Sequence, residues 1–339
     1  MKIHKLIYLP VFLLFFTSCN KNDNPAPQEF VFPSKVIKKI IVDPSGVKWF
    51  ATDKGVISFD GTKWTTYSDD KNLSTGPISD LAFDLTTGIK NLLLASKVGY
   101  SIFGIETSKI SFQNFNTQNS GILTDTVTSI GVDASNIKYL GTSKGLSILK
   151  SNKWDKYLGR YGDGEPLLKY KISSISAATN GYIFATTEGG GVSRFKYTDA
   201  ISGATTYKLP WAWGLPSDTV FTVFVDGETQ WYGTLRGAAF HSTELTKSDW
   251  VTYTRTEGLI CDSVYAISKD LSGAIWFGTH DGVTKLTMGT KDTVWTNYTT
   301  KDGLIANKIN TIAIDLEGKI WFGTDEGISQ FSNNKWTNY

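Results

Sequence analysis

The sequence predicts an all-β protein, a seven-bladed β-propeller of four-stranded antiparallel blades. Three observations predict it: a four-residue phrase recurs seven times, successive copies lie 44 to 48 residues apart, and each copy is flanked by turn sequences typical of β-hairpins. Helical repeats have similar periods, so the spacing alone does not decide the architecture. The local pattern decides it, because apolar runs alternate with tight turns and no helical period accompanies them.

The recurring phrase starts with a large apolar residue, ends with Ser or Thr, and is followed three residues later by glycine. Its copies are residues 49–52, 93–96, 139–142, 183–186, 231–234, 276–279 and 321–324. We assign the phrase to the second strand of each repeat. Seven such copies predict seven blades in residues 36–339.

The strand before the phrase is an apolar run that ends in Asp or a substitute, as in 36–43, 220–226, 264–270 and 309–315. A turn of the form Asp-x-x-Gly then leads into the phrase. The Asp side chain hydrogen-bonds to the turn backbone and the Gly adopts a positive φ, so this sequence is typical of a β-hairpin turn. One carboxylate per turn is too few for calcium, so no metal is expected there. The predicted first strands begin near these residues: Val36, Ile78, Val127, Ile172, Val220, Val264 and Ile309.

The strands after the phrase complete each blade. The third alternates apolar and polar residues, as in 145–149 and 327–331. The fourth carries a Trp and a Tyr three residues apart, in the pairs Trp64/Tyr67, Trp154/Tyr157, Trp250/Tyr253, Trp295/Tyr298 and Trp336/Tyr339. Since the last repeat has its own fourth strand, the ring need not borrow one from the N-terminal side.

Packing between blades explains the choice of residues. Each blade is covered on both faces by its neighbours, so most Trp and Tyr side chains are expected to be blade-to-blade core. The small residue after the aromatic pair of the phrase (Gly141, Gly233, Gly278 or Gly323) would let adjacent blades approach closely. Leu259 and Leu304, in Gly-Leu pairs of the blade-to-blade loops, are expected to be buried under the rim.

One repeat carries the resemblance most clearly. The pattern Gly303-Leu304, Asn310, Asp315, Gly318 and 321–324 resembles the two-component regulator propeller repeat. The resemblance covers about residues 36–339 and is weakest in the second and fourth repeats. It implies a relation to the periplasmic sensor regions of hybrid sensor kinases in polysaccharide-degrading bacteria, in which propellers help to recognise glycan fragments. This chain has one propeller and no kinase or receiver region, so the resemblance implies recognition and not direct signalling.

Residues 1–18 have the layout of a signal peptide. Lys2 and Lys5 precede an apolar stretch, 6–16, that is too short to span a bilayer as a mature helix. Thr17-Ser18-Cys19 resembles the lipobox of bacterial lipoproteins, although Phe16 stands where Leu is preferred. We therefore expect lipidation at Cys19, a flexible tether over 19–35, and an outer-membrane anchor facing the periplasm or the surface. The alternative is an ordinary cleaved signal with an incidental cysteine.

Composition excludes several classes of function. Without Lys2 and Lys5 the chain has 32 basic and 32 acidic residues, and a neutral chain without a basic tract is a poor nucleic-acid binder. Beyond the leader only His241, His280 and Cys261 remain, so no Cys/His zinc site, disulfide or redox pair is expected. No cofactor is expected, and Cys261 is expected to be a small buried residue.

Candidate ligand residues follow from where the repeats vary. In a propeller the second-to-third turns and the blade-to-blade loops share one rim, at the mouth of the central channel. The residues of these turns differ from repeat to repeat, whereas the phrase before them is nearly constant. Such variation suggests a binding site that is not repeated in every blade, although exposed turns also vary without a function. The turn residues expected to bind ligand are Glu188, Arg236, His280, Asp281 and Asp325.

Two blade-to-blade loops also depart from the common form. One, 158–171, contains Arg160 and Tyr161; the other, 210–215, contains Trp211 and Trp213. Exposed aromatic side chains near an arginine suit the flat faces of sugars. We expect Trp211 and Trp213 to share one ligand-facing patch with Arg236 and His280. The alternative is that both Trp pack against the fourth blade, where 198–207 is interpreted as an insertion.

The expected function is that of a noncatalytic extracytoplasmic module that binds glycan or a similar polar ligand at the rim. A protein-docking scaffold at the outer membrane, with other outer-membrane proteins as partners, is the first alternative. A polysaccharide lyase or hydrolase is the second. A lyase would use His280 with Arg236 or a Tyr, and a hydrolase would use Asp281 with Asp325 or Glu326. No nucleophile motif accompanies either histidine, so no catalytic residue is assigned.

Overall fold

The chain folds into seven separate four-stranded antiparallel sheets. A computed structural model describes residues 30–67, 76–84, 91–106, 109–158, 171–209, 214–242, 250–289 and 292–339, and these residues hold 28 strands and no helix. Residues Phe32–Tyr339 form one compact unit. Within the described part of the chain, accordingly, no helix could cross a membrane. The leader and Cys19 lie outside the described residues, so lipidation remains a prediction.

Each blade uses four consecutive strands. Blades 1 and 2 contain β1 (Ile37–Val42), β2 (Lys48–Thr52), β3 (Gly55–Phe59), β4 (Trp64–Tyr67), β5 (Ile78–Asp84), β6 (Asn91–Ser96), β7 (Gly99–Glu106) and β8 (Lys109–Phe115). Blades 3 and 4 contain β9 (Val127–Val132), β10 (Lys138–Thr142), β11 (Gly145–Lys150), β12 (Lys153–Tyr157), β13 (Ile172–Ala177), β14 (Tyr182–Thr187), β15 (Val192–Tyr197) and β16 (Ile201–Tyr207). Blades 5 to 7 contain β17 (Val220–Asp226), β18 (Thr229–Thr234), β19 (Gly237–Ser242), β20 (Val251–Tyr253), β21 (Val264–Lys269), β22 (Ile275–Thr279), β23 (Val283–Met288), β24 (Thr293–Tyr298), β25 (Ile309–Ile314), β26 (Ile320–Thr324), β27 (Ile328–Ser332) and β28 (Lys335–Asn338).

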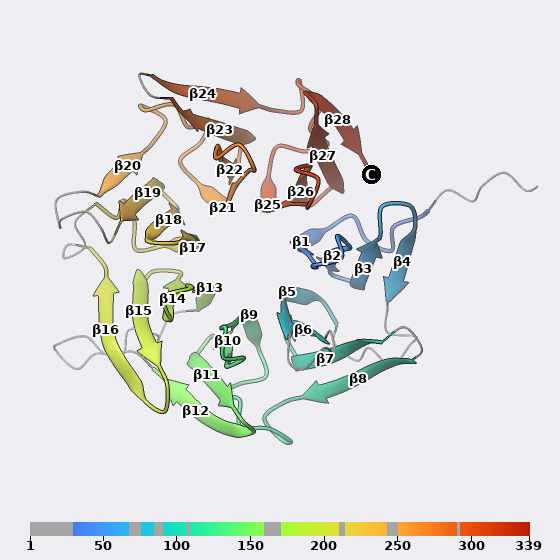
Figure 1. Ribbon diagram of the computed structural model, residues 1–339, viewed down its shortest axis with the longest axis vertical. Coiled ribbons are helices and arrows are strands. Elements are labelled where there is room, and N and C mark those ends of the chain that lie inside the picture. The colour runs from blue at the N-terminus through green and yellow to red at the C-terminus, as the bar shows by residue number, and fades with distance from the viewer. Residues whose placement is uncertain are drawn as a thin grey trace, which may run out of the picture. The chain divides into compact units, whose positions relative to one another are not determined.

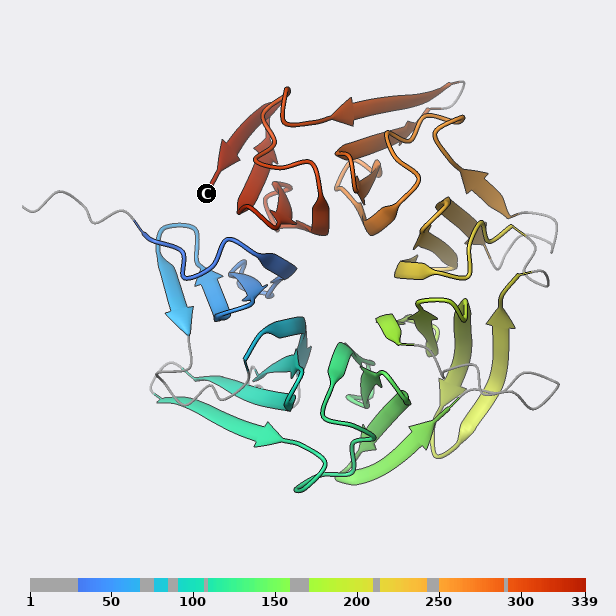
Figure 2. The ribbon, with the colours of Figure 1, turned by 180° about the vertical axis from the view of Figure 1, so that it is seen from behind.

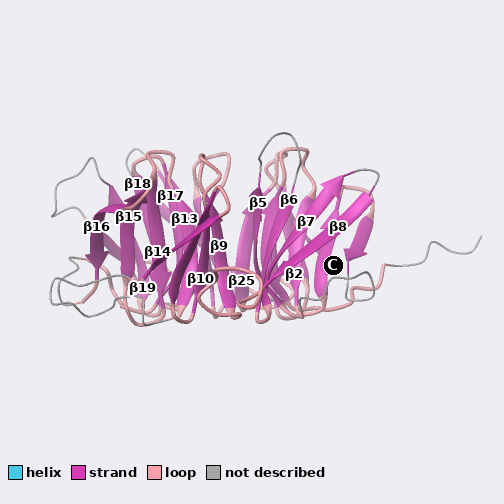
Figure 3. Ribbon diagram, turned by 90° about the horizontal axis from the view of Figure 1, so that it is seen from below, coloured by secondary structure: helices cyan, strands magenta, loops and turns pink. Residues whose placement is uncertain are grey.

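The blades stand around a central channel in chain order, so the predicted seven-bladed propeller is confirmed (Figure 1). Six of the seven predicted first residues are the observed ones, and the first blade begins at Ile37 instead of Val36. The same ring from behind shows blade 7 beside blade 1 (Figure 2). Seen side-on, the strands run between two rims that carry the loops (Figure 3). The seven first strands lie innermost in the ring (Figure 1).

The aromatic side chains form the core between blades, as predicted. The phrase Trp of blades 1, 5, 6 and 7 stacks on the Tyr of its own blade's outer aromatic pair, with ring centroids 5.8 Å apart. Trp276 of blade 6 also packs on Phe322 and Phe331 of blade 7. Burying an aromatic ring removes about 150–250 Å² from water, so these contacts hold neighbouring blades together.

The Asp turns are fixed to the aromatic core. In blades 6 and 7 one carboxylate oxygen of Asp270 or Asp315 accepts backbone N–H groups of the turn. The second oxygen accepts the indole N–H of the phrase Trp, at 2.7 Å from Trp276 and 2.9 Å from Trp321. The aspartate therefore joins the turn to the blade interface. No three His, Cys, Asp or Glu residues of the described ranges are arranged to hold a metal ion.

The Ser or Thr that ends each phrase closes the next turn. Its hydroxyl donates to the carbonyl of the glycine that begins the third strand or directly precedes it, and this bond occurs in all seven blades. In blade 4 the residue that makes it is Thr187, which pairs with Ile172 as Thr234 pairs with Val220. The sequence alignment of the fourth repeat was therefore wrong by one residue: its phrase is 184–187, and the turn that follows is one residue longer.

A second correction also concerns blade 4. Residues 198–207 are not an insertion, because β16 (Ile201–Tyr207) is the fourth strand of the blade and pairs with β15. This strand has no Trp/Tyr pair of the usual spacing, so the aromatic signal was missing. The blade has the same four strands as the others.

The phrase glycines are required by the approach of the next blade. A Cβ at Gly141, Gly278 or Gly323 would lie 2.6 Å from Cγ2 of the first residue of the following blade: Ile172, Ile309 or Ile37. That is far inside van der Waals contact, so these glycines set the blade spacing. Leu259 and Leu304 are both 3% exposed and lie under the rim as expected, and Cys261 is buried.

The ring closes by side-chain and backbone contacts without a shared strand. Blades 1 and 7 each have all four of their own strands. Across the seam the Asn310 amide donates to the carbonyl of Ile37 at 3.0 Å, and the Ile40 N–H donates to the hydroxyl of Thr311 at 3.3 Å. Trp64 of blade 1 packs on Tyr339 of blade 7, with centroids 5.3 Å apart. The predicted closure is confirmed.

Candidate ligand site at the channel mouth

One residue in the first strand of every blade is directed into the channel. In each blade the pairing of the first two strands shifts register after the first residue, which leaves the second residue outside the ladder. Such a bulge re-aims the side chain of the extra residue. The seven residues, called here the mouth ring, are Lys38, Ser79, Thr128, Ser173, Phe221, Tyr265 and Asn310.

The mouth ring lines a cavity of about 740 Å³. Its wall also contains residues of the second-to-third turns (Asp53, Lys97, Ser143 and Glu188) and of the blade-to-blade loops (Pro77, Thr126, Lys171 and Lys308). A smaller space of about 140 Å³ continues along the first strands, past Lys39, Asp80 and Thr311. Turns and blade-to-blade loops therefore share one rim, as the sequence predicted.

The wall of the cavity is apolar on one side and polar on the other. Phe221 and Tyr265, from adjacent blades 5 and 6, are half-buried and lie with ring centroids 4.8 Å apart. Blades 2 to 4 contribute only hydroxyl side chains to the ring. Thr128 donates to the carbonyl of Ile172 at 2.6 Å, and Ser173 donates to the carbonyl of Val220. These hydroxyls are thereby oriented and keep their oxygen lone pairs as acceptors.

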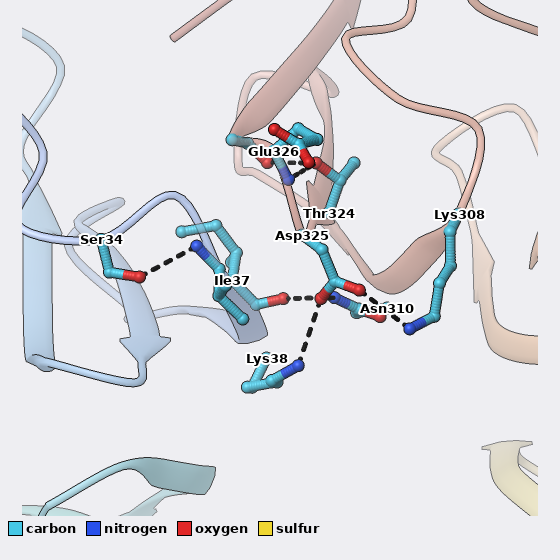
Figure 4. Close-up of polar contacts among 10 residues, drawn as sticks. Ser34, Ile37, Lys38, Lys308, Asn310, Thr324, Asp325 and Glu326 are labelled. Atoms are coloured by element: carbon cyan, nitrogen blue, oxygen red, sulfur yellow. Dashed lines mark hydrogen bonds and ion pairs between the residues drawn. The ribbon is translucent and has the colours of Figure 1, made fainter.

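Asp325 is held where blades 7 and 1 meet at the mouth. Its carboxylate accepts from Lys38 at 3.2 Å, from Lys308 at 2.8 Å and from the amide of Asn310 at 2.8 Å (Figure 4). Burial acts to raise the pKa of Asp325, but the hydrogen bonds from Lys308, Asn310 and Lys38 together hold this pKa well below its ordinary value. The role of Asp325 in binding a ligand stays a prediction.

Glu188 belongs to the same mouth, on blade 4. Its carboxylate lies 2.5 Å from the ammonium of Lys171, and its backbone N–H donates to the carbonyl of Lys171 at 3.0 Å. Both side chains line the cavity. On blade 1, Oδ1 of Asp53 is buried and has no hydrogen-bond partner among the described residues. Charged groups from blades 1, 2, 4 and 7 thus converge on the cavity.

A second charged cluster lies on blade 6, away from the wall of this cavity. The Asp281 carboxylate lies 2.7 Å from Nδ1 of His280 and 2.8 Å from Nη2 of Arg255. The hydrogen bond from His280 lowers the pKa of Asp281, with burial opposing and Arg255 assisting. All three side chains are more than two-fifths exposed. His241, the other histidine, lies 2.9 Å from Gln230 and stacks on Trp250, so it belongs to the packing of blade 5.

The predicted site residues are therefore only partly brought together. Glu188 lines the cavity, and Asp325 bonds three lining residues without lining it itself. Arg236, on the exposed second-to-third turn of blade 5, and His280 and Asp281 are not among the lining residues. Arg160, Tyr161, Trp211 and Trp213 fall outside the described residues. The patch of Trp211, Trp213, Arg236 and His280 stays a prediction.

Reasoning from the sequence missed the mouth ring. Its signal was present: the residue after the first β-branched residue of each blade is Lys, Ser, Thr, Ser, Phe, Tyr and Asn in turn, while the residues before it are all Ile or Val. A strand pattern alone would not direct these residues into the channel, because the bulge appears only in the pairing.

The fold and the cavity define a seven-bladed β-propeller with an open polar site at one mouth of its channel. No protein-family model and no curated protein matches the sequence. Solved structures do match: the extracellular domain of the putative hybrid two-component system BT3049 from B. thetaiotaomicron has a TM-score of 0.70 at 20% identity, over 89% of this chain and 39% of that one. The chain spans about two-fifths of the length of this structure and of the extracellular domain of BT4673, which it also matches.

Two further structures show how widely the fold is used. PorZ, a surface component of the type-IX secretion system of Porphyromonas gingivalis, matches with a TM-score of 0.70 at 16% identity, over 90% of this chain and 48% of PorZ. Virginiamycin B lyase from Staphylococcus aureus matches with a TM-score of 0.64 at 13% identity, over 87% of this chain and 93% of the lyase. At these identities the likeness establishes the fold alone.

Proposed function

We propose that the protein is a noncatalytic extracytoplasmic module that binds a saccharide or a similar polar ligand in the cavity at the channel mouth. One observation carries the proposal: a cavity of about 740 Å³ has a half-buried aromatic pair on one side and oriented hydroxyl and charged groups on the other. Its size is in the range of small-molecule binding sites.

The two sides of the cavity match the two surfaces of a sugar. A pyranose ring has an apolar face of C–H groups and a polar edge of hydroxyls. Phe221 and Tyr265 would cover the face, and the hydroxyls of Ser79 and Thr128 would contact the edge. Stacking on an aromatic ring buries on the order of 100 Å², which is about 2–3 kcal/mol of favourable free energy.

The state of the acidic residues supports binding over hydrolysis. A glycosidase needs a carboxyl group with a raised pKa as general acid. Asp325 and Asp281 both have lowered pKa values because each is hydrogen-bonded to cationic or potentially cationic side chains. Glu188 is paired with Lys171. These carboxylates favour a structural or ligand-binding role over proton donation.

Replacing either aromatic residue is the direct test. Phe221→Ala and Tyr265→Ala should each weaken binding of a saccharide identified on a glycan array by about 30-fold, since each removes about 2 kcal/mol of contact with the sugar face. Thermal melts should change little, because both side chains are half-buried at the channel. Calorimetric titration measures the first effect and calorimetric melting the second.

Tyr182→Ala provides the matched control. Tyr182 is a half-buried aromatic at the start of β14, near the opposite rim, so its loss should leave binding intact. Unchanged affinity in both mouth variants would refute the proposed site. If no saccharide on the array binds, the protein-docking alternative is favoured. Exposed apolar side chains that could serve it include Leu271 and Leu316 on the opposite rim.

The proposal includes lipid anchoring at Cys19. Extracellular domains among the structural neighbours support export, and the leader supports the anchor. Metabolic labelling with a fatty-acid probe should mark the wild-type protein and not Cys19→Ala, because the thiol is the acceptor of the lipid. Equal labelling of the two proteins would show that the cysteine is incidental and would favour an ordinary cleaved signal.

A further inference from the structure

The cavity at the channel mouth carries an excess of positive charge. Four lysines, Lys38, Lys97, Lys171 and Lys308, line it against two lining carboxylates, Asp53 and Glu188, and the carboxylate of Asp325, which bonds Lys38 and Lys308 from beside the wall. A concave site with one excess sign of charge concentrates counter-ions of the other sign, because its low-dielectric walls focus the field. The charge of the cavity therefore favours a negatively charged ligand.

The donors around Asp325 already form a receptor for a carboxylate. Two ammonium groups and one amide, from Lys38, Lys308 and Asn310, converge on its two oxygens within 3.2 Å. The carboxylate comes from the protein itself, on the second-to-third turn of blade 7. An ammonium group has three N–H donors. One carboxylate uses at most two donors of each lysine, so at least one donor of each lysine remains.

The two lysines are also open to a ligand from outside. The side chains of Lys38 and Lys308 are 42% and 45% exposed, and both belong to the cavity wall. Lys38 is a member of the mouth ring, separated from Tyr265 only by Asn310 in the order of the blades. A ligand that lies on the aromatic pair can therefore extend toward the lysines along the same wall.

We propose that the ligand is an acidic saccharide whose carboxylate or sulfate group binds Lys38 and Lys308, with its ring against Phe221 and Tyr265. This inference rests on the proposed function and narrows its ligand class. Asp325 occupies part of the anion receptor in the free protein, so it competes with the ligand and lowers its affinity. Neutral saccharides gain only the aromatic and hydroxyl contacts and bind more weakly.

The test uses the whole protein and an array of di- to tetrasaccharides in matched neutral, uronate-containing and sulfated forms. We expect the acidic forms to bind at least tenfold more tightly than their neutral counterparts at low salt, and this advantage to shrink as ionic strength rises. The uronate and sulfated arms identify which anionic group is preferred. Titration calorimetry then gives affinities for the best acidic fragment and its neutral counterpart.

Four variants assign the effect to the receptor. Lys38→Met and Lys308→Met should each lower affinity for the acidic fragment about five- to tenfold, a range that allows for their solvent exposure, and leave the neutral counterpart unchanged. Asp325→Asn should raise affinity for the acidic fragment several-fold. Lys269→Met is the control, because Lys269 forms a similar inter-blade pair with Asp226 at 2.5 Å, at the ends of β21 and β17 that face the opposite rim.

The possible failures are distinguishable. Equal affinity for acidic and neutral fragments would overturn the anionic ligand and leave the proposed function standing. Binding by neither class would overturn both. An equal loss in Lys269→Met would show that the protein's general charge, and not this receptor, attracts the ligand. The bonds of Asp325 also join blade 7 to blade 1, so Asp325→Asn could fail to fold. In that case the two lysine variants still decide the question.

Discussion

Trp321→Ala should lower the free energy of unfolding by about 3–5 kcal/mol, as large cuts in a well-packed core do. Trp321 is 1% exposed, and its ring stacks on Tyr339 within blade 7. It also packs across the seam, with centroids 6.1 Å from Phe50 and 5.8 Å from Phe59 of blade 1. The substitution therefore opens a cavity between the first and last blades. Urea unfolding followed by tyrosine and tryptophan fluorescence measures the loss.

Two comparisons make this result specific. Trp321→Phe keeps much of the ring contact but loses the N–H that donates to Asp315, so it should cost clearly less than alanine. Trp154→Ala removes an indole from the outer strand β12, where the side chain is only half-buried, and should also cost less. If Trp321→Ala were no worse than Trp154→Ala, the seam would not depend on this ring.

Asp315→Ala is expected to have a similarly large effect for an electrostatic reason. The carboxylate is 3% exposed and accepts the N–H groups of Glu317, Lys319 and the Trp321 indole. Lys48 of blade 1, itself only 5% exposed, has its ammonium 3.9 Å away. Removing Asp315 leaves these donors and a nearly buried cation without their acceptor, which costs about 3–5 kcal/mol. Chemical denaturation at neutral pH measures it.

Asp60→Ala is the matched control for Asp315→Ala. Asp60 closes the turn between β3 and β4 with the same kind of bonds, to the N–H groups of Thr62 and Lys63, and these bonds lower its pKa to about 2. Asp60 is exposed, so water replaces the lost bonds and the loss should be much smaller. Lys48→Met combined with Asp315→Asn should cost less than the sum of the single changes, because no unpaired charge remains. Additive losses would contradict the coupling between Lys48 and Asp315.

The fold could be predicted from the sequence because its signals are local and repeated. A strand of β-branched residues, an Asp-x-x-Gly turn and the phrase follow one another within about 15 residues, and seven copies average out local exceptions. The fourth repeat shows the limit. Thr186 and Thr187 are both threonines, so the sequence does not show which of them closes the turn. The fourth strand of this repeat lacks the Trp/Tyr pair, so β16 was interpreted as an insertion.

The candidate site was less predictable because it depends on contacts far apart in the chain. Glu188 and Asp325 were chosen because the turns vary, and both lie at the mouth. The aromatic pair Phe221 and Tyr265 comes from two different repeats, and only ring closure brings Lys38 to Asp325, 287 residues away. The bulge that directs the mouth ring inward lies in the pairing of the strands and not in their composition.

The seam has a consequence for chain connectivity. Trp64 is in contact with both Phe32, at 4.8 Å between ring centroids, and Tyr339, at 5.3 Å, so the two ends of the propeller unit meet at one side chain. Among the described residues, no strand passes between blades 7 and 1. The fold therefore does not depend on which blade comes first in translation. A circular permutant that joins Phe32 to Tyr339 through a short linker and opens at another blade-to-blade loop would retain every sheet of the ring.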